Sequence, residues 1–229
     1  MSNTSVAENL AQTRERAAKA SRDAGRNPND TQLVAVSKRQ DDNRIDQALA
    51  AGHRHFGENR VQEAIARWSH RRETYPDLVL HLIGPLQTNK VRDAVGLFDM
   101  IEVIDRPKLA KAVSSAITAL DRRPRLLVQV NTGSEDQKSG VEPSHLGELL
   151  AYCREECGLE IDGLMCIPPI EDPPAPHFAF LAKLAREHGL PRVSMGMTGD
   201  FETAIHQGAT EIRVGTAIFG PRPPQSSNG

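Results

Sequence analysis

The stretch Leu33-Val34-Ala35-Val36-Ser37-Lys38 decides the fold that we expect for this chain. Its apolar and β-branched residues are typical of a strand that is buried on both faces. The strand ends in a lysine, and a polar segment, residues 39–43, follows it. Loss of water at such a position disfavours the ammonium form of a lysine, and a neutral amine can form a Schiff base with a carbonyl compound. Lys38 could instead extend into solvent, as most lysines do, and this stretch alone does not decide for the Schiff base.

The composition excludes several classes of protein. The net charge is −2, with acidic and basic residues interspersed, which argues against the basic face of a nucleic-acid-binding protein. No basic segment followed by an apolar run opens the chain, so we expect no signal peptide. No apolar run approaches the roughly 20 residues of a membrane span. Three cysteines suggest reduced thiols, and we expect a cytoplasmic protein that binds neither nucleic acid nor membranes.

Seven further strand candidates follow the first, and helical patterns separate them. They lie near residues 55–59, 78–83, 100–104, 126–130, 161–167, 193–197 and 211–214. Strands that alternate with helices form parallel β/α units. Eight such units predict an α/β fold, a (β/α)8 TIM-type barrel, with an extra N-terminal helix that begins at the capping-box pair Ser5 and Glu8. The alternative, an open doubly wound sheet, is disfavoured because no G-x-G-x-x-G turn follows the first strand.

We expect one domain over residues 1–220 and a disordered tail over residues 221–229, which are rich in Pro, Ser and Gly. The proline-rich segment 168–176 is expected to be too stiff for a helix, so the next helix is predicted over residues 177–188. Trp68 is expected in the core. Cys153 and Cys157 are interpreted as packing residues, because no cluster with metal-ligand spacing accompanies them.

The working face of such a barrel is the carboxyl end of its strands. There the sequence places Lys38, Asn59, Arg213 and two glycine-containing loops, residues 194–200 and 214–216. Glycines let the backbone approach an anion, to which hydroxyl and N–H groups can donate. The two loops therefore predict a phosphate site. Asp200 either faces this anion or caps the helix that follows.

A lysine that faces a phosphate site points to a phosphorylated carbonyl compound. Pyridoxal 5′-phosphate (PLP) has both an aldehyde and a phosphate. Arg213 lies two residues before Gly215 and shares its face of the strand. A guanidinium can only donate, so Arg213 would keep the pyridine nitrogen of the cofactor unprotonated. Alternatively, Arg213 is an interior arginine that pairs with Glu58 or Asp200.

Several segments carry a resemblance to a known family. They are Val34-Ala35-Val36-Ser37-Lys38, His55-Phe56-Gly57-Glu58-Asn59, His81-Leu82-Ile83-Gly84-Pro85-Leu86-Gln87-Thr88-Asn89-Lys90, Gln137-Lys138-Ser139-Gly140-Val141, Gly163-Leu164-Met165, Ser194-Met195-Gly196-Met197 and Arg213-Val214-Gly215-Thr216-Ala217-Ile218-Phe219-Gly220. Over nearly its whole length, the chain resembles the pyridoxal-phosphate homeostasis proteins. These are single-domain proteins similar to the barrel domain of alanine racemase, PLP fold type III.

The resemblance implies a set of cofactor-binding residues and no established catalytic residue. The implied roles are a Schiff base (internal aldimine) at Lys38, a place beside the cofactor for Asn59, phosphate binding by Ser194, Gly215 and Thr216, and a contact of Arg213 with the pyridine nitrogen. Members of the family are described as carriers or regulators of the intracellular vitamin B6 pool. This sequence departs from the usual pattern at Arg39-Gln40 and at Thr198-Gly199. Lys138 is either a second aldehyde-binding amine or a solvated loop residue.

Two kinds of function remain open at this point. One is a PLP carrier without catalysis, monomeric, with PLP-dependent apo-enzymes as recipients; the other is a PLP-dependent racemase or decarboxylase. A two-base racemase needs a second acid, which the resembling racemases supply as a tyrosine from an added domain. We expect no added domain, and neither Tyr75 nor Tyr152 is placed to serve. A Schiff-base aldolase acting on a sugar phosphate would need a carboxylate near the lysine, for which Glu58 is the only candidate.

Overall fold

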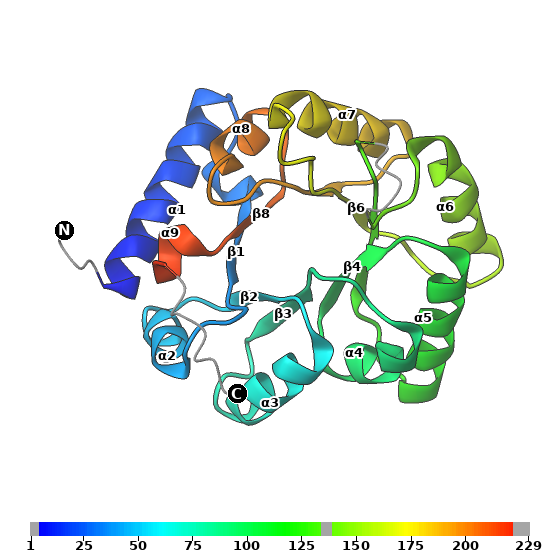
Figure 1. Cartoon of the computed structure of the whole chain (residues 1–229), viewed down its shortest axis with the longest axis horizontal. Helices are drawn as coiled ribbons and strands as arrows, with labels where there is room; N and C mark the ends of the chain where they lie inside the picture. The colour runs from blue at the N-terminus through cyan, green and yellow to red at the C-terminus, as the bar shows by residue number, and fades with distance from the viewer. Residues whose placement is uncertain (1–4, 134–138, 222–229) are drawn as a thin grey trace.

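Eight parallel strands close into a barrel around the centre of the molecule (Figure 1). The computed structural model describes residues 5–133 and 139–221, so Lys138 and the predicted tail beyond Pro221 lie outside the described residues. The strands are β1 Gln32–Val36, β2 His55–Glu58, β3 Val79–Leu82, β4 Met100–Ile104, β5 Arg125–Gln129, β6 Gly163–Met165, β7 Arg192–Ser194 and β8 Glu211–Val214. Since β1 pairs with both β2 and β8, the predicted barrel is confirmed and the open sheet is excluded.

Helices surround the barrel on its outer side (Figure 1). They are α1 Val6–Asp23, α2 Asp42–Ala50, α3 Val61–Thr74, α4 Val91–Leu97, α5 Pro107–Leu120, α6 Leu146–Glu155, α7 Pro174–Glu187, α8 Phe201–His206 and α9 Thr216–Phe219, with 3-10 turns η1 Pro28–Asp30, η2 Thr88–Lys90 and η3 Pro143–His145. Within the described part of the chain, none of them has the length and apolar character needed to cross a membrane.

The extra helix at the front, α1, begins as predicted. The hydroxyl of Ser5 accepts a hydrogen bond from the backbone N–H of Glu8 at 3.2 Å, and the carboxylate of Glu8 accepts one from the N–H of Ser5 at 2.8 Å. This reciprocal pair satisfies donors that the first turn leaves unpaired. The helix packs against α8, α9 and α2, so it covers the outer side of the barrel where its first and last strands meet.

Helix α7 differs from the prediction. It begins at Pro174 rather than at residue 177, inside the segment that we expected to be too stiff. Proline lacks an N–H, but the first turn of a helix has no intrahelical acceptor for that group. Pro174 is therefore compatible with the first helical position.

The two faces of the strands have different neighbours. Phe56 of β2 faces outward, where its ring packs 4.7 Å from that of Trp68 in α3, and Trp68 is fully buried, as predicted. A Cβ added to the next residue, Gly57, would instead meet the side chains of Val34 and Ile83, so this face points into the barrel. The interior is unusually polar, because it also contains the buried side chains of His81, Glu102, Ser194 and Arg213.

Candidate functional site

A cavity of about 230 Å³ lies at the carboxyl end of the barrel, and we call it the lysine cavity. Its lining residues come from the carboxyl ends of six of the strands and the segments that follow them: Val36, Lys38, Asn59, Ile83, Ile167, Met197, Thr198, Gly199, Arg213, Gly215 and Thr216. The structure thus brings together five of the six residues predicted to bind a cofactor. Their roles in binding remain predictions.

Lys38 is half-buried at the end of β1, next to Val36 on the same cavity wall. The chain turns sharply after it: Arg39 has a φ of 59°, and the N–H of Gln40 donates to the carbonyl of Ser37 at 3.1 Å. A left-handed backbone is costly for a residue with a side chain. The turn ends the strand, so the lysine lies at the rim of the barrel rather than within the wall.

Asn59 is held in place by a close backbone contact. A Cβ on Gly84 would lie 2.4 Å from the carbonyl oxygen of Asn59, so only glycine fits at this position. The N–H of Ile83 donates to the carbonyl of Glu58 at 2.9 Å and fixes the same two segments together. The side-chain Oδ1 of Asn59 is buried and has no hydrogen-bond partner among the described residues. A buried polar atom of this kind calls for a ligand or water.

Arg213 is buried, with an exposed fraction of 3%. Its Nη1 donates to the hydroxyl of Ser194 at 2.6 Å, and its Nη2 donates to the carbonyl of Cys166 at 2.7 Å. Burial raises the pKa of the Cys166 thiol to about 12, so this neighbour is uncharged at neutral pH. Two fixed hydrogen bonds hold the guanidinium at the wall of the lysine cavity.

The alternative partners that the sequence suggested for Arg213 are bound elsewhere. Asp200 accepts a hydrogen bond from the N–H of Met197 at 2.5 Å. It stands at the N-terminus of α8 without capping that helix through its side chain. The carboxylate therefore stabilises its own loop, which answers the question that the sequence left open for Asp200.

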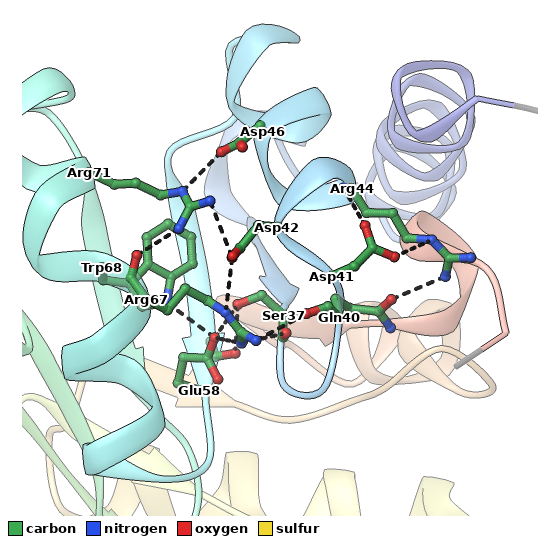
Figure 2. Close-up of polar contacts among 11 residues, drawn as sticks. Ser37, Gln40, Asp41, Asp42, Arg44, Asp46, Glu58, Arg67, Trp68 and Arg71 are labelled. Carbon is green, nitrogen blue, oxygen red and sulfur yellow. Dashed lines mark hydrogen bonds and ion pairs between the residues drawn. The ribbon is translucent and has the colours of Figure 1, made fainter. Parts of the chain in front are cut away.

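Glu58 lies on the outer side of the barrel, between the strands and α3 (Figure 2). It is fully buried, and its Oε1 accepts from Ser37 Oγ at 2.8 Å, Arg67 Nη1 at 2.9 Å and Trp68 Nε1 at 3.1 Å. Lys38 lines the inner cavity, whereas Glu58 does not. The only carboxylate available to the aldolase hypothesis is thus turned away from the lysine.

Ser194 is the predicted residue that does not reach the lysine cavity. It is fully buried below the rim, where its hydroxyl donates to Glu102 Oε2 at 2.5 Å while accepting from Arg213. Thr198 and Gly199 line the cavity from the same loop instead. The Thr198 hydroxyl accepts from the N–H of Gly215 at 3.2 Å and joins the loops after β7 and β8.

The sequence contains a signal that indicates which of these two hydroxyls reaches the cavity. Ser194 ends a strand, so its side chain follows the inward face of the pleat. Thr198 lies past Gly196, whose φ of 89° turns the chain over the rim. A hydroxyl after that turn is better placed for a ligand at the mouth than one before it.

The charge of the lysine cavity is one-sided. Lys38 and Arg213 are basic, and among the described residues that line the cavity none is acidic. A larger cavity of about 630 Å³ shares the wall at Asn59 and contains both signs of charge, in Arg60, Lys90 and Glu63. The combination of an amine, a fixed guanidinium and two glycine-containing loops occurs in the smaller cavity, which therefore suits a compact anion with a carbonyl group.

Comparison with protein families gives a match to the alanine racemase N-terminal domain over residues 7–223. A pyridoxal phosphate homeostasis protein of Aquifex aeolicus is 39% identical to the chain, over 94% of this chain and 97% of the relative. The protein of the same name in Escherichia coli K12 is 38% identical, over 95% and 97%. Both matches cover nearly the whole length of each protein.

Solved structures include similar proteins as well. PipY of Synechococcus elongatus PCC7942 with PLP bound is 39% identical and covers 94% of this chain and 100% of its own, with a TM-score of 0.80. An alanine racemase of Streptomyces coelicolor, at 19% identity and a TM-score of 0.73, covers 95% of this chain but 59% of its own. The second likeness shows the barrel fold alone.

Proposed function

This chain belongs to the pyridoxal phosphate homeostasis protein family, and on that premise we propose that it binds PLP in the lysine cavity and takes part in maintaining the intracellular supply of this cofactor. The proposal gives each predicted residue of the cavity a specific task. It also extends to the recipients, which we propose to be PLP-dependent apo-enzymes.

The residues of the cavity fit the groups that PLP carries. Lys38 offers an amine for the aldehyde, and Arg213 offers a permanent donor for the ring nitrogen, which can only accept. The loops with Thr198, Gly199, Gly215 and Thr216 offer hydroxyl and N–H donors for the phosphate. Asn59, whose buried Oδ1 has no partner within the described part of the chain, would lie beside the ring.

The covalent step that we propose uses Lys38 alone among the side chains. Its neutral Nζ adds to the aldehyde carbon, the aldehyde oxygen leaves as water, and a C=N bond replaces the C=O bond. PLP supplies an electrophilic aldehyde and an electron-withdrawing ring. Because Arg213 cannot give up a proton, it would keep the ring nitrogen unprotonated, which weakens electron withdrawal and favours holding the cofactor over amino-acid chemistry.

The observation that carries this proposal is the composition of the cavity wall, which has two basic side chains and no carboxylate among its described residues. A racemase would need a second acid beside the ring. Neither Tyr75, at the end of α3, nor Tyr152, inside α6, lines the cavity. No other observation favours the enzymatic alternative.

Binding is tested by adding PLP to the purified protein and recording its visible absorption. We expect a visible band in the wild type, its loss in Lys38→Ala, and its retention in Lys90→Ala. Lys90 is a matched control because it lines the neighbouring cavity instead. Retention of the band in Lys38→Ala would contradict the proposed site.

The carrier role is tested separately by mixing the PLP-loaded protein with a PLP-dependent apo-enzyme. We expect the apo-enzyme to gain PLP faster than the loaded protein releases it into buffer. Equal rates would indicate passive binding. Turnover of an amino acid at about 1 s⁻¹ or faster, an ordinary enzymatic rate, would instead favour a racemase or decarboxylase.

A further inference from the structure

We propose that Glu102 is a positioning residue, which acts through Ser194 to hold the guanidinium of Arg213 toward the lysine cavity. The inference deepens the proposed function and rests on it. It assigns a purpose to the polar barrel interior, which neither the sequence patterns nor the cavity itself explains.

A chain of hydrogen bonds runs through the barrel and ends at Arg213. It starts at His55, whose Nδ1 lies 3.2 Å from Nε2 of His81. His81 Nδ1 lies 2.7 Å from Glu102 Oε1, and Glu102 Oε2 accepts from the Ser194 hydroxyl at 2.5 Å. Ser194 in turn accepts from Arg213 Nη1 at 2.6 Å.

This chain of hydrogen bonds crosses the interior of the barrel rather than following its wall. His81 and Glu102 lie on the adjacent strands β3 and β4, whereas Ser194 and Arg213 lie on β7 and β8. The contact between Glu102 and Ser194 joins two parts of the wall that are three strands apart in the closed order. Glu102 is fully buried, so this contact lies inside the barrel.

The donor and acceptor roles of Arg213, Ser194 and Glu102 can be assigned in only one way. Arginine can only donate, so Ser194 Oγ accepts from it. The single proton of Ser194 then goes to Glu102, which accepts both from Ser194 and from His81 when ionised. Burial opposes ionisation of Glu102. The hydrogen bond and charge of His81, the charge of Arg213 and the hydrogen bond from Ser194 favour it more strongly. The pKa of the carboxyl therefore lies below its usual range.

The other end of the hydrogen-bond chain, at His55, lies at the amino-terminal mouth of the barrel. A cavity of about 460 Å³ there includes His55, His81 and the first residues of most strands in its lining. Burial and the neighbouring His81 lower the pKa of His55 to about 4, so its imidazole is neutral at pH 7. The carboxylate joined to Arg213 is Glu102, inside the barrel and linked through Ser194, whereas the described lining of the lysine cavity includes no carboxylate.

This arrangement has a specific consequence for ligand binding. The lysine cavity contains no carboxylate among its described lining residues that could compete for Arg213. Its partners are the Ser194 hydroxyl and the Cys166 carbonyl, on Nη1 and Nη2, which leaves guanidinium N–H groups for a ligand. Without the anchor through Ser194, we expect the guanidinium to lose its fixed direction and the contact with the ring nitrogen to weaken.

The test compares PLP with an analogue in which the ring nitrogen is replaced by carbon while the aldehyde and phosphate are unchanged. The variants are Ser194→Ala and Glu102→Gln. The matched control is Glu211→Gln, because Glu211 is an equally buried carboxylate on the same strand as Arg213 that binds Arg192 and Thr210 instead. Thermal unfolding of each variant monitors folding.

We expect wild-type protein to bind PLP about tenfold or more tightly than the carbon analogue, the range for a hydrogen bond to a charged group. Ser194→Ala and Glu102→Gln should reduce this preference to about threefold or less, and Glu211→Gln should keep it. If Glu102→Gln fails to fold, Ser194→Ala alone tests the inference, because it retains the charges of both Glu102 and Arg213.

Two results would overturn the inference while leaving the proposed function standing. One is a wild-type protein that binds PLP without preferring it to the analogue. The other is a folded Ser194→Ala variant that keeps the full wild-type preference, or a control variant that loses it to the same extent. Failure of the wild type to bind PLP through Lys38 would overturn the proposed function itself, and the inference with it.

Discussion

The hydroxyl of Thr198 accepts a hydrogen bond from the backbone N–H of Gly215 at 3.2 Å, and this contact joins the two loops that close one side of the lysine cavity. The sequence had suggested Ser194 for the phosphate of the cofactor, but its hydroxyl is committed to Glu102 and Arg213. The two hydroxyls therefore have separable roles that ligand analogues can distinguish.

Thr198→Ala is expected to weaken binding of PLP about five- to tenfold, because a typical hydrogen bond contributes roughly 1 kcal/mol. Its affinity for pyridoxal, which lacks the phosphate, should stay unchanged. Ser194→Ala should lower the affinity for both compounds by the same factor. Titration of each variant with both compounds checks this. A phosphate-specific loss in Ser194→Ala would instead support the predicted role of Ser194 in phosphate binding.

Gly84→Ala is expected to disrupt the cavity wall at Asn59, because the added methyl group would lie 2.4 Å from the Asn59 carbonyl oxygen. Overpacking of this kind costs about 1–3 kcal/mol, and displacement of Asn59 should also weaken PLP binding. Urea denaturation and PLP titration measure the two effects. The control is Gly96→Ala in α4, where the nearest atom is 3.9 Å away, and alanine should stabilise the helix by about 0.5–1 kcal/mol.

Arg67→Ala is expected to lower the free energy of unfolding by about 3 kcal/mol or more, because it leaves the buried Glu58 carboxylate without its cation. PLP binding by the folded fraction should also weaken, because Arg67 donates to the carbonyls of Ser37 at 3.1 Å and Gln40 at 3.0 Å, on either side of Lys38 (Figure 2). Arg60→Ala, in an exposed pair with Glu63, should cost less than about 1 kcal/mol. Equal losses of stability in the two variants would contradict this difference.

Acidification is expected to destabilise the fold through His53. Arg14 Nη2 lies 3.1 Å from His53 Nδ1. Burial together with the charge of Arg14 lowers the pKa of His53 from its usual 6.5 to about 3. Unfolded protein therefore binds an extra proton between these values, and stability falls as pH falls below about 6.5. From pH 7 to pH 5 this one residue should remove about 2 kcal/mol.

The pH effect is measured by urea denaturation at the two pH values. His53→Gln should be less stable at pH 7 but should lose about 2 kcal/mol less than the wild type on acidification. The same pH dependence in variant and wild type would assign the proton uptake to other groups, among them His55, whose pKa is lowered to about 4.

The sequence predicted the barrel because short apolar segments such as residues 33–36 recur with helical patterns between them. Their periodicity is a local property, and so is the place where each strand ends. Five of the six predicted cofactor-binding residues accordingly meet at one cavity. The start of α7 at Pro174 was missed because proline was treated as a helix breaker without regard to its position in the first turn.

What the sequence did not predict depends on the direction of side chains across the barrel. Glu102 lies in the apolar segment Ile101-Glu102-Val103, and His81 lies between Leu80 and Leu82. A charged or polar residue inside a buried strand was a signal that each needs a partner. The partner of Glu102 on β7 is 92 residues away in sequence, and only the closed barrel brings the two together.

The most direct test of the central claim is to locate the bond between the protein and PLP. The loaded protein is reduced with borohydride, digested, and analysed by mass spectrometry. The account predicts one reduced pyridoxyl-phosphate adduct, on Lys38. An adduct confined to other lysines, or no adduct in protein saturated with PLP, would contradict it.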